Sequence, residues 1–294
     1  MRLILTISLF ELAAVLPAAA ETPHPAGWSW EPGIAGPLML VALLFLVGLA
    51  RACRRAAQVP WLRVLSFCAG WLALVIALNS PIHALAEQLF WVHMVQHELL
   101  MVVAAPLLVA AQPMALMLWA IPLRWRQGLG SLFKLPAMAA SWWLLSSPLV
   151  AWLLHAAALW LWHMPSLFDA ALEMESVHAL QHLCFFGSGL LFWWMLLYGR
   201  HGRMGYGAAL IYVFTTAAHN TALSALLVLS PRPWYQHYLN LTAASSLSAL
   251  EDQQLGGLIM WVPASLVYLA AGLYLFSAWL KESDVALVRA FRAK

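Results

Sequence analysis

The chain has 294 residues, of which 64% are apolar and only 9% are charged, and its formal net charge is +3. This composition excludes a soluble globular domain and predicts a polytopic membrane protein of the all-α class. The small positive charge gives no support for nucleic-acid binding, because membrane topology explains the arginines. The three cysteines are isolated and form no CxxC pair, which argues against a disulfide framework or a thiolate metal site.

The first apolar segment is short and ends in three alanines before Glu21. A single basic residue, Arg2, precedes it, and this pattern is typical of a cleaved secretory signal, which we place at residues 1–20. Glu11 interrupts the apolar run, and without cleavage the segment would add one more span. The rest of the chain is predicted to form a membrane domain over residues 21–280 and a cytoplasmic tail over residues 281–294.

Seven later runs have about the 20 apolar residues that a helix needs to cross a bilayer. They cover residues 33–50, 62–80, 90–111, 142–162, 177–198, 206–229 and 253–277. A shorter apolar stretch at residues 114–123 is bracketed by prolines, so we expect an interfacial or re-entrant piece there. The sequence therefore predicts a bundle of about seven transmembrane helices.

The connections between these runs alternate in charge, which predicts the orientation of the chain. Basic residues follow the first, third, fifth and seventh runs: Arg51, Arg54, Arg55 and Arg63; Arg124, Arg126 and Lys134; Arg200 and Arg203; Lys281, Arg289, Arg292 and Lys294. Acidic residues such as Glu87, Asp169 and Glu251 occupy the opposite connections. The positive-inside rule then places the C-terminus in the cytoplasm and the N-terminus outside.

One polar pattern occurs twice inside the apolar runs, first as His93, Gln96 and His97 and then as His178, Gln181 and His182. Positions i, i+3 and i+4 share one face of a helix, so each copy presents a polar stripe. Both stripes lie in the first turns of a span that enters from outside, with His97 and His182 roughly 10 Å or less below the boundary. Ionisable groups at this depth are costly, and we therefore expect them to have a function.

Imidazoles from facing helices are a common way to build a metal or haem site in a bundle. The predicted primary ligands are His93, His97, His178 and His182. Alternate or transfer ligands are His155, His163, His219 and Met94. Groups that orient the imidazoles are Gln96, Gln181, Glu98 and Asp252. Imidazole with thioether sulfur, without thiolate or clustered carboxylates, favours copper as Cu(I).

Two other classes of function fit parts of this pattern. A bis-histidine haem protein for membrane electron transfer also needs histidines at matched depth on separate spans. A proton-coupled transporter could use Glu98 and the histidines as a relay, although the inner halves of the spans are almost wholly apolar. A lone histidine such as His155 or His219 can also serve only as a hydrogen-bonding contact between helices.

Three ordered motifs resemble the multi-spanning CtaG family of cytochrome c oxidase assembly factors: His93-Met94-Val95-Gln96-His97, His178-x-x-Gln181-His182-Leu183 with Phe185-Phe186, and Asp252-Gln253-Gln254-x-Gly256-Gly257-x-x-x-Trp261. The resemblance covers most of the chain after the signal region. It implies an integral membrane factor that helps an oxidase acquire its metal. Together with the histidines and the charge pattern, it predicts a protein that handles copper on the periplasmic side of a bacterial inner membrane, without enzymatic turnover. The implied partners are cytochrome c oxidase subunits or copper chaperones, and no catalytic residue comes with the resemblance.

Overall fold

The computed structural model describes residues 27–199, 204–239 and 247–292, and within these ranges the chain forms helices and turns without a strand. Six stretches are long and apolar enough to cross a membrane: α2 (Pro32–Arg54), α3 (Trp61–Asn79), the run of α5 (Phe90–Glu98), η1 (Leu99–Ala104) and α6 (Ala105–Ala111), α12 (Glu175–Tyr198), α13 (Tyr206–Leu229) and α15 (Ala249–Arg292). They coincide with six of the seven predicted spans. The predicted all-α polytopic bundle is confirmed.

The remaining predicted span, residues 142–162, is two helices and not one straight rod. α9 (Pro136–Leu145) and α10 (Pro148–Trp162) meet at an angle of 67°. Pro148 cannot donate a backbone hydrogen bond into the preceding turn, and Ser147 caps the new helix by accepting from the Val150 N–H at 3.3 Å. α10 alone is about 22 Å long, shorter than the hydrocarbon core.

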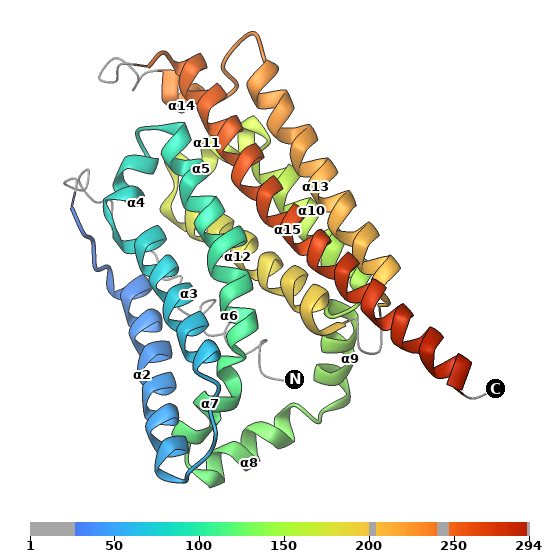
Figure 1. Cartoon of the computed structure of the whole chain (residues 1–294). Coiled ribbons are helices and arrows are strands. Elements are labelled where there is room, and N and C mark those ends of the chain that lie inside the picture. Colours follow the sequence, from blue (N-terminus) through green and yellow to red (C-terminus); the bar gives the residue numbers. More distant parts are fainter. Residues whose placement is uncertain (1–26, 200–203, 240–246, 293–294) are drawn as a thin grey trace.

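The short stretch after the third span is a separate helix, α7 (Pro113–Ala120), as its bracketing prolines indicate. It packs along α2 at Gly48, where a side chain would collide with the backbone carbonyl of Leu116. Arg51 donates to the carbonyls of Trp119 and Ala120 and so satisfies the C-terminal end of α7. α8 (Leu123–Leu132) follows and lies at the same end of the bundle (Figure 1).

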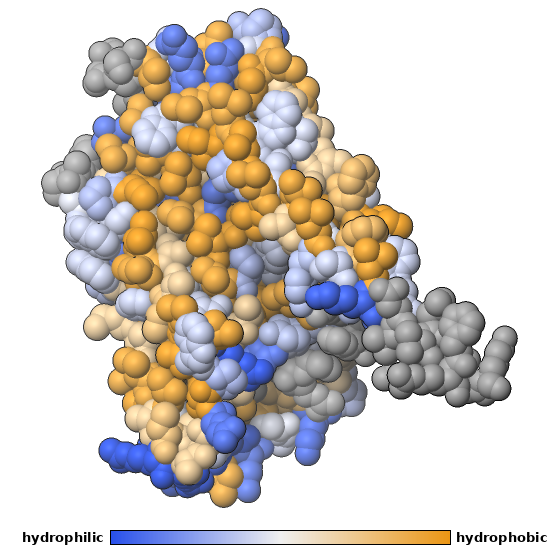
Figure 2. Space-filling model, in the orientation of Figure 1, coloured by the Kyte–Doolittle hydropathy of each residue, from blue (hydrophilic) through white to orange (hydrophobic). Residues whose placement is uncertain are grey.

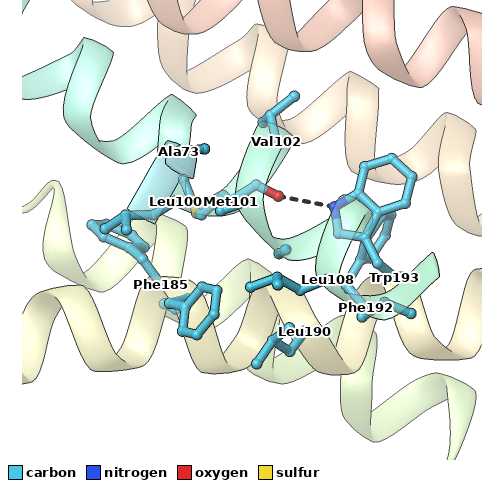
Figure 3. Packing of buried hydrophobic residues seen from close by; sticks show 14 of the residues in the cluster. Ala73, Leu100, Met101, Val102, Leu108, Phe185, Leu190, Phe192 and Trp193 are labelled. Atoms are coloured by element: carbon cyan, nitrogen blue, oxygen red, sulfur yellow. Dashed lines mark hydrogen bonds between the residues drawn. The ribbon is translucent and has the colours of Figure 1, made fainter. Parts of the chain in front are cut away.

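The run α5–η1–α6 lies between the other long helices and is the most buried of the six candidate spans (Figure 1). Its middle section is a π-helix, in which carbonyls bond to N–H groups five residues later. Pro106 lies five residues after Met101 and has no N–H to offer. The Met101 carbonyl instead accepts from the indole N–H of Trp193 on α12 at 2.9 Å, which closes the core at this point (Figure 3).

The outer surface fits a lipid environment. Leu43, Leu62, Phe214 and Leu266 come from four different long helices, and each is more than half exposed. Figure 2 shows hydrophobic residues over the middle of the visible face and hydrophilic residues gathered towards its two ends. Such a belt is expected of side chains that contact lipid tails.

Short helices cover the end of the bundle opposite α8: α4 (Pro81–Ala86), α11 (Pro165–Glu173) and α14 (Gln236–Leu239) (Figure 1).

Towards the C-terminus, α15 continues to Arg292 and passes the predicted domain boundary at residue 280 without a break. The predicted signal segment, residues 1–20, lies outside the described residues.

Candidate metal centre

The two histidine motifs meet at the end of the bundle that α4, α11 and α14 cover. His93 and His97 lie one turn apart on α5, with their Nε2 atoms 2.9 Å apart. His178 and His182 lie one turn apart on α12, with ring centroids 4.2 Å apart. The rings of His93 and His178 are 5.2 Å apart across the helix interface. One nitrogen from each of His93, His178 and His182 lies within 4.8 Å of the other two.

His163 completes this group from α10. It lies just past the last residue of that helix, and its ring is 6.2 Å from the ring of His97. Its Nδ1–H donates to the Leu159 carbonyl at 2.6 Å, so the neutral ring carries its lone pair on Nε2. We use the term histidine cage for His93, His97, His163, His178 and His182, all of which are buried.

A tyrosine fixes the tautomer of His93. The Tyr238 hydroxyl, on α14, donates its single proton to the Ala86 carbonyl at 2.7 Å. Its 3.2 Å contact with His93 must therefore have the Nδ1–H of the imidazole as donor, which leaves the lone pair on Nε2. Burial raises the pKa of the Tyr238 phenol, and the charge of Asp252 adds to this effect, so the hydroxyl stays protonated.

Four imidazole nitrogens of the cage are buried without a hydrogen-bond partner among the described residues. They are Nδ1 of His97 and Nε2 of His163, His178 and His182. Nearly all buried polar atoms in proteins are paired. Leaving one buried donor or acceptor without a partner costs about 1–3 kcal/mol of folding free energy. Two of these residues, His178 and His182, belong with His93 to the group whose nitrogens lie within 4.8 Å of one another, and neutral imidazoles in such a group suit a metal ion.

His83 on α4 is a member of the site that the motifs did not predict. Its ring stacks on that of His178, with centroids 5.5 Å apart and planes inclined by 14°. The Gln96 amide donates to the Ala77 carbonyl at 2.7 Å and to Nδ1 of His83 at 3.0 Å, which places the proton of neutral His83 on Nε2. Gln96 thus contacts the imidazole of His83, a histidine outside the motif. The Gln181 amide lies beside His93.

Asp252 acts on the backbone that carries the cage. Its carboxylate accepts from the N–H groups of Phe90 at 2.8 Å and Trp91 at 2.9 Å, so it caps the first turn of α5 from α15. His93 and His97 follow within two turns. Asp252 therefore positions the helix, and both of its carboxylate oxygens bond to backbone N–H groups and not to an imidazole.

Two other predicted residues point away from the cage. Met94 is fully buried at the crossing of α5 and α15, where a β-carbon on Gly256 would lie 3.1 Å from its Cγ. Glu98 is buried, and Oε2 of its carboxyl group has no hydrogen-bond partner in the described part of the chain. It lies near Tyr268 of α15.

The predicted ligands His155 and His219 are not brought into the cage. His155 lies on α10 eight residues before His163, about 12 Å further along the helix axis. His219 lies on α13, and its ring meets the edge of Trp152 at 5.5 Å. The structure thus divides the predicted ligand set into two groups.

Aromatic side chains enclose the cage. Phe185 lies 4.4 Å from the ring of His97, and Phe168 of α11 lies 4.9 Å from that of His93. Tyr235 donates to the His163 carbonyl at 3.1 Å and closes the same side. Phe168 and Tyr235 lie in short connecting segments, whose position against the histidines cannot be predicted from hydrophobic periodicity. Of the aromatic residues around the cage, only the motif Phe185-Phe186 could be noticed in the sequence.

Comparisons with curated proteins give relatives without an assigned function. Uncharacterized proteins of Mycobacterium bovis and Mycobacterium tuberculosis are each 26% identical over 268 residues, which cover 87% of this chain and 40% of each relative. An uncharacterized protein of Mycobacterium leprae is 24% identical over 288 residues, with 92% of this chain and 43% of the relative covered. The chain therefore spans less than half the length of these curated relatives.

No solved structure matches the chain. The model of one protein family, described as cytochrome c oxidase caa3 assembly factor, matches residues 43–282. This range contains all five histidines of the cage, together with His83, Tyr238 and Asp252. The three motifs that suggested the CtaG resemblance also fall inside it. The chain belongs to the cytochrome c oxidase caa3 assembly factor family, Caa3_CtaG.

Proposed function

We propose that this protein assists the maturation of cytochrome c oxidase by holding a Cu(I) ion in the histidine cage. Family membership supports the role in oxidase assembly. The observation that carries the metal assignment is the convergence of His93, His178 and His182, whose nearest nitrogens lie within 4.8 Å of one another inside the bundle. His97 and His163 each have a further buried nitrogen without a hydrogen-bond partner among the described residues of the cage.

The charge of the cage favours a monovalent ion. Within the described residues, the group of metal-binding side chains at this place contains histidines and no carboxylate. The cost of moving an ion from water into a low-dielectric interior grows with the square of its charge, so a divalent ion without a counter-charge is strongly disfavoured. Neutral imidazole is a good ligand for copper, and Cu(I) accepts low coordination numbers.

The packing also favours a small ion over a haem group. Phe185 and Phe168 press directly on the imidazoles of His97 and His93, with centroid distances of 4.4 and 4.9 Å. A porphyrin between two axial histidines would need the space that these rings fill. The bis-histidine haem interpretation therefore has less support than the copper interpretation.

The cage suits a carrier that exchanges its ion with partners. It contains more imidazoles than one Cu(I) ion needs, and ligand exchange among them requires no turnover chemistry. The charge pattern of the connections supports a position of this end of the bundle on the periplasmic side of a bacterial inner membrane. Cytochrome c oxidase subunits and copper chaperones are the proposed partners.

The test is the metal content of the full chain purified in detergent and loaded with Cu(I), measured by elemental analysis beside a visible absorbance scan. We expect bound copper, no Soret band, and loss of cage-bound copper in the double variant His97→Ala/His182→Ala. The control His201→Ala, whose position the charge pattern assigns to the cytoplasmic side, should keep its copper. Equal copper in the double variant would refute the cage as the site, and a Soret band would establish the haem alternative.

A further inference from the structure

α8 lies across the end of the bundle that the charge pattern predicts to be cytoplasmic, crosswise to α2 (Figure 1). None of its residues is buried, so other helices cover little of its surface. Trp125, Leu129 and Leu132 recur at i, i+4 and i+7 and share one face of the helix. Arg124 and Ser131 lie on another face. A helix with such separate apolar and basic faces is typical of the boundary between lipid tails and headgroups.

The apolar face of α8 borders an open hollow of about 590 Å³. Trp125, Gly128, Leu129 and Leu132 contribute to its wall, and Arg124 lines it as well. At Gly128 the wall is bare backbone, and a β-carbon there would have no atom within 4 Å. A wall that is mainly apolar and has one guanidinium group fits a ligand with a hydrocarbon chain and an anionic group.

Further cations lie beside the start of α8. Arg51, near the C-terminal end of α2, donates to the Trp119 carbonyl of α7 at 3.1 Å. The guanidinium of Arg55, which follows α2, lies 5.4 Å from the centre of the Trp119 ring. Since α8 begins only four residues after Trp119, these arginines add to the positive charge that Arg124 and Arg126 place around it.

The helices that carry these cations contain no carboxylate of their own. The sequence has no Asp or Glu between residues 32 and 86, which include α2, or between residues 99 and 168, which include α7 and α8. In the part of the chain that the structure describes, Nε of Arg126 is buried without a hydrogen-bond partner. Anionic headgroups can supply the missing charge, since arginines near a membrane surface attract anionic lipids.

We propose that α8 forms a binding site for an anionic phospholipid, with an acyl chain in the hollow and the phosphate at Arg124. A guanidinium group can donate two parallel hydrogen bonds to a phosphate, which makes arginine a more specific phosphate ligand than a single point charge. The positive-inside rule accounts for the cations at this end, but not for an apolar hollow beside one of them. The site is separate from the histidine cage and does not rest on the proposed copper function.

The experiment is native mass spectrometry of the full chain in detergent, titrated with phosphatidylglycerol or with phosphatidylcholine of the same acyl chains. We expect bound phosphatidylglycerol and little phosphatidylcholine. Arg124→Gln should weaken phosphatidylglycerol binding about fivefold. Lys281→Gln removes a cation from an exposed position of α15, and this control should bind as the wild type does.

A second pair of variants tests the hollow at constant charge. Gly128→Leu puts a side chain into the hollow, whereas Gly130→Leu adds the same side chain to α8 outside the wall of the hollow. Neither β-carbon would meet an atom within 4 Å, so both variants should fold, which an SDS titration checks. We expect weaker phosphatidylglycerol binding only in Gly128→Leu.

Three results of these measurements would overturn the proposal: equal binding of the two lipids, equal losses in Lys281→Gln and Arg124→Gln, or the same behaviour of the two glycine variants. Equal losses in the two charge variants would show that only the general charge of this end attracts lipid. A dimer of the chain without bound lipid would assign the surface to a second copy and would also overturn the proposal.

Discussion

The two halves of the central span α5–η1–α6 are held in place by different interactions. The half that the charge pattern predicts to face outward, α5, is called the outer half; it buries polar side chains such as His93, Gln96 and His97, and the first two of these contact other elements by hydrogen bonds. The inner half, η1 and α6, buries alanines at Ala104, Ala105 and Ala111 and packs closely against α3 and α12.

The difference suggests that the inner half determines how the helices pack, whereas the outer half contains the candidate site. Small residues let helix backbones approach closely in a membrane, where the hydrophobic effect does not drive helices together. The inner half can therefore set the arrangement of the bundle by shape alone. The outer half contains polar groups such as His93 and Gln96, whose hydrogen-bond partners come from other helices, and so depends on the arrangement that the inner half provides.

The largest effect is expected from removing the cap of the outer half. Asp252→Ala leaves the N–H groups of Phe90 and Trp91 without acceptors, and losing two charge-assisted hydrogen bonds should lower the free energy of unfolding by about 3 kcal/mol. The start of α5 should also fray, which weakens Cu(I) binding. Unfolding in an SDS titration and competition for Cu(I) with a chromophoric chelator measure the two effects.

The matched control is the neighbouring carboxylate Glu251. It is exposed and accepts from the backbone and hydroxyl of Ser248 at the start of its own helix. Glu251→Ala should have a much smaller effect on unfolding and none on copper binding. Equal effects of the two substitutions would show that the contact between α15 and α5 is not what holds the cage.

The packing of the inner half should be most sensitive to substitution at Gly70, which lies on α3 and faces α6. A β-carbon there would lie 2.9 Å from Cγ of Leu108 and 3.1 Å from its backbone nitrogen. Gly70→Val should therefore push α3 from α6 and cost about 2 kcal/mol of unfolding free energy. Gly36→Val on α2, where no atom lies within 4 Å of the added β-carbon, is the control. Similar losses in both variants would remove the close-packing explanation.

The architecture was predictable because apolar run length is a strong signal in membrane proteins. The runs at residues 177–198 and 206–229 became α12 and α13 almost without change. The kink between α9 and α10 was less accessible, since Pro148 lies inside a continuous apolar run. Hydropathy depends only on the composition of a run. The bend depends on local hydrogen bonding, because Pro148 has no N–H to donate and the Ser147 hydroxyl caps the second helix.

Within the candidate site, the sequence identified the residues that share a helix face and missed those that arrive from short connecting segments. The i, i+4 pairs on α5 and α12 predicted that imidazoles would gather there. His83 and Tyr238 lie on α4 and α14, whose positions depend on tertiary contacts. The same limit explains why His155 and His219 were grouped with the cage, because depth in the membrane does not fix direction around a helix.

A smaller effect, confined to the outer half, is expected for Tyr238→Phe. The substitution removes the acceptor that holds the Nδ1–H of His93, so the ring can adopt either tautomer and the lone pair of Nε2 is no longer fixed. Loss of such an orienting contact should weaken Cu(I) binding about tenfold, or ~1.4 kcal/mol. The chelator competition assay measures this change.

Tyr235→Phe is the control for that variant. It removes a hydroxyl from the same segment, but one that donates to the backbone carbonyl of His163 and not to an imidazole nitrogen. Its Cu(I) affinity should stay close to that of the wild type. If both variants lose the same affinity, the tyrosines act by closing the cage and the tautomer argument is wrong.

The smallest effect concerns the junction between the two halves. Trp193→Phe keeps an aromatic ring against the core but leaves the Met101 carbonyl without its indole donor, which should cost about 1 kcal/mol in SDS unfolding. Trp194→Phe removes the adjacent indole from a position that packs on Tyr198 and serves as the control.

Because Met101 lies one turn below His97, Trp193→Phe also tests whether the two halves of the central span are coupled. Unchanged Cu(I) affinity in Trp193→Phe would mean that the outer half keeps its geometry without the closed π-helix, whereas reduced affinity would mean that the inner half positions the cage.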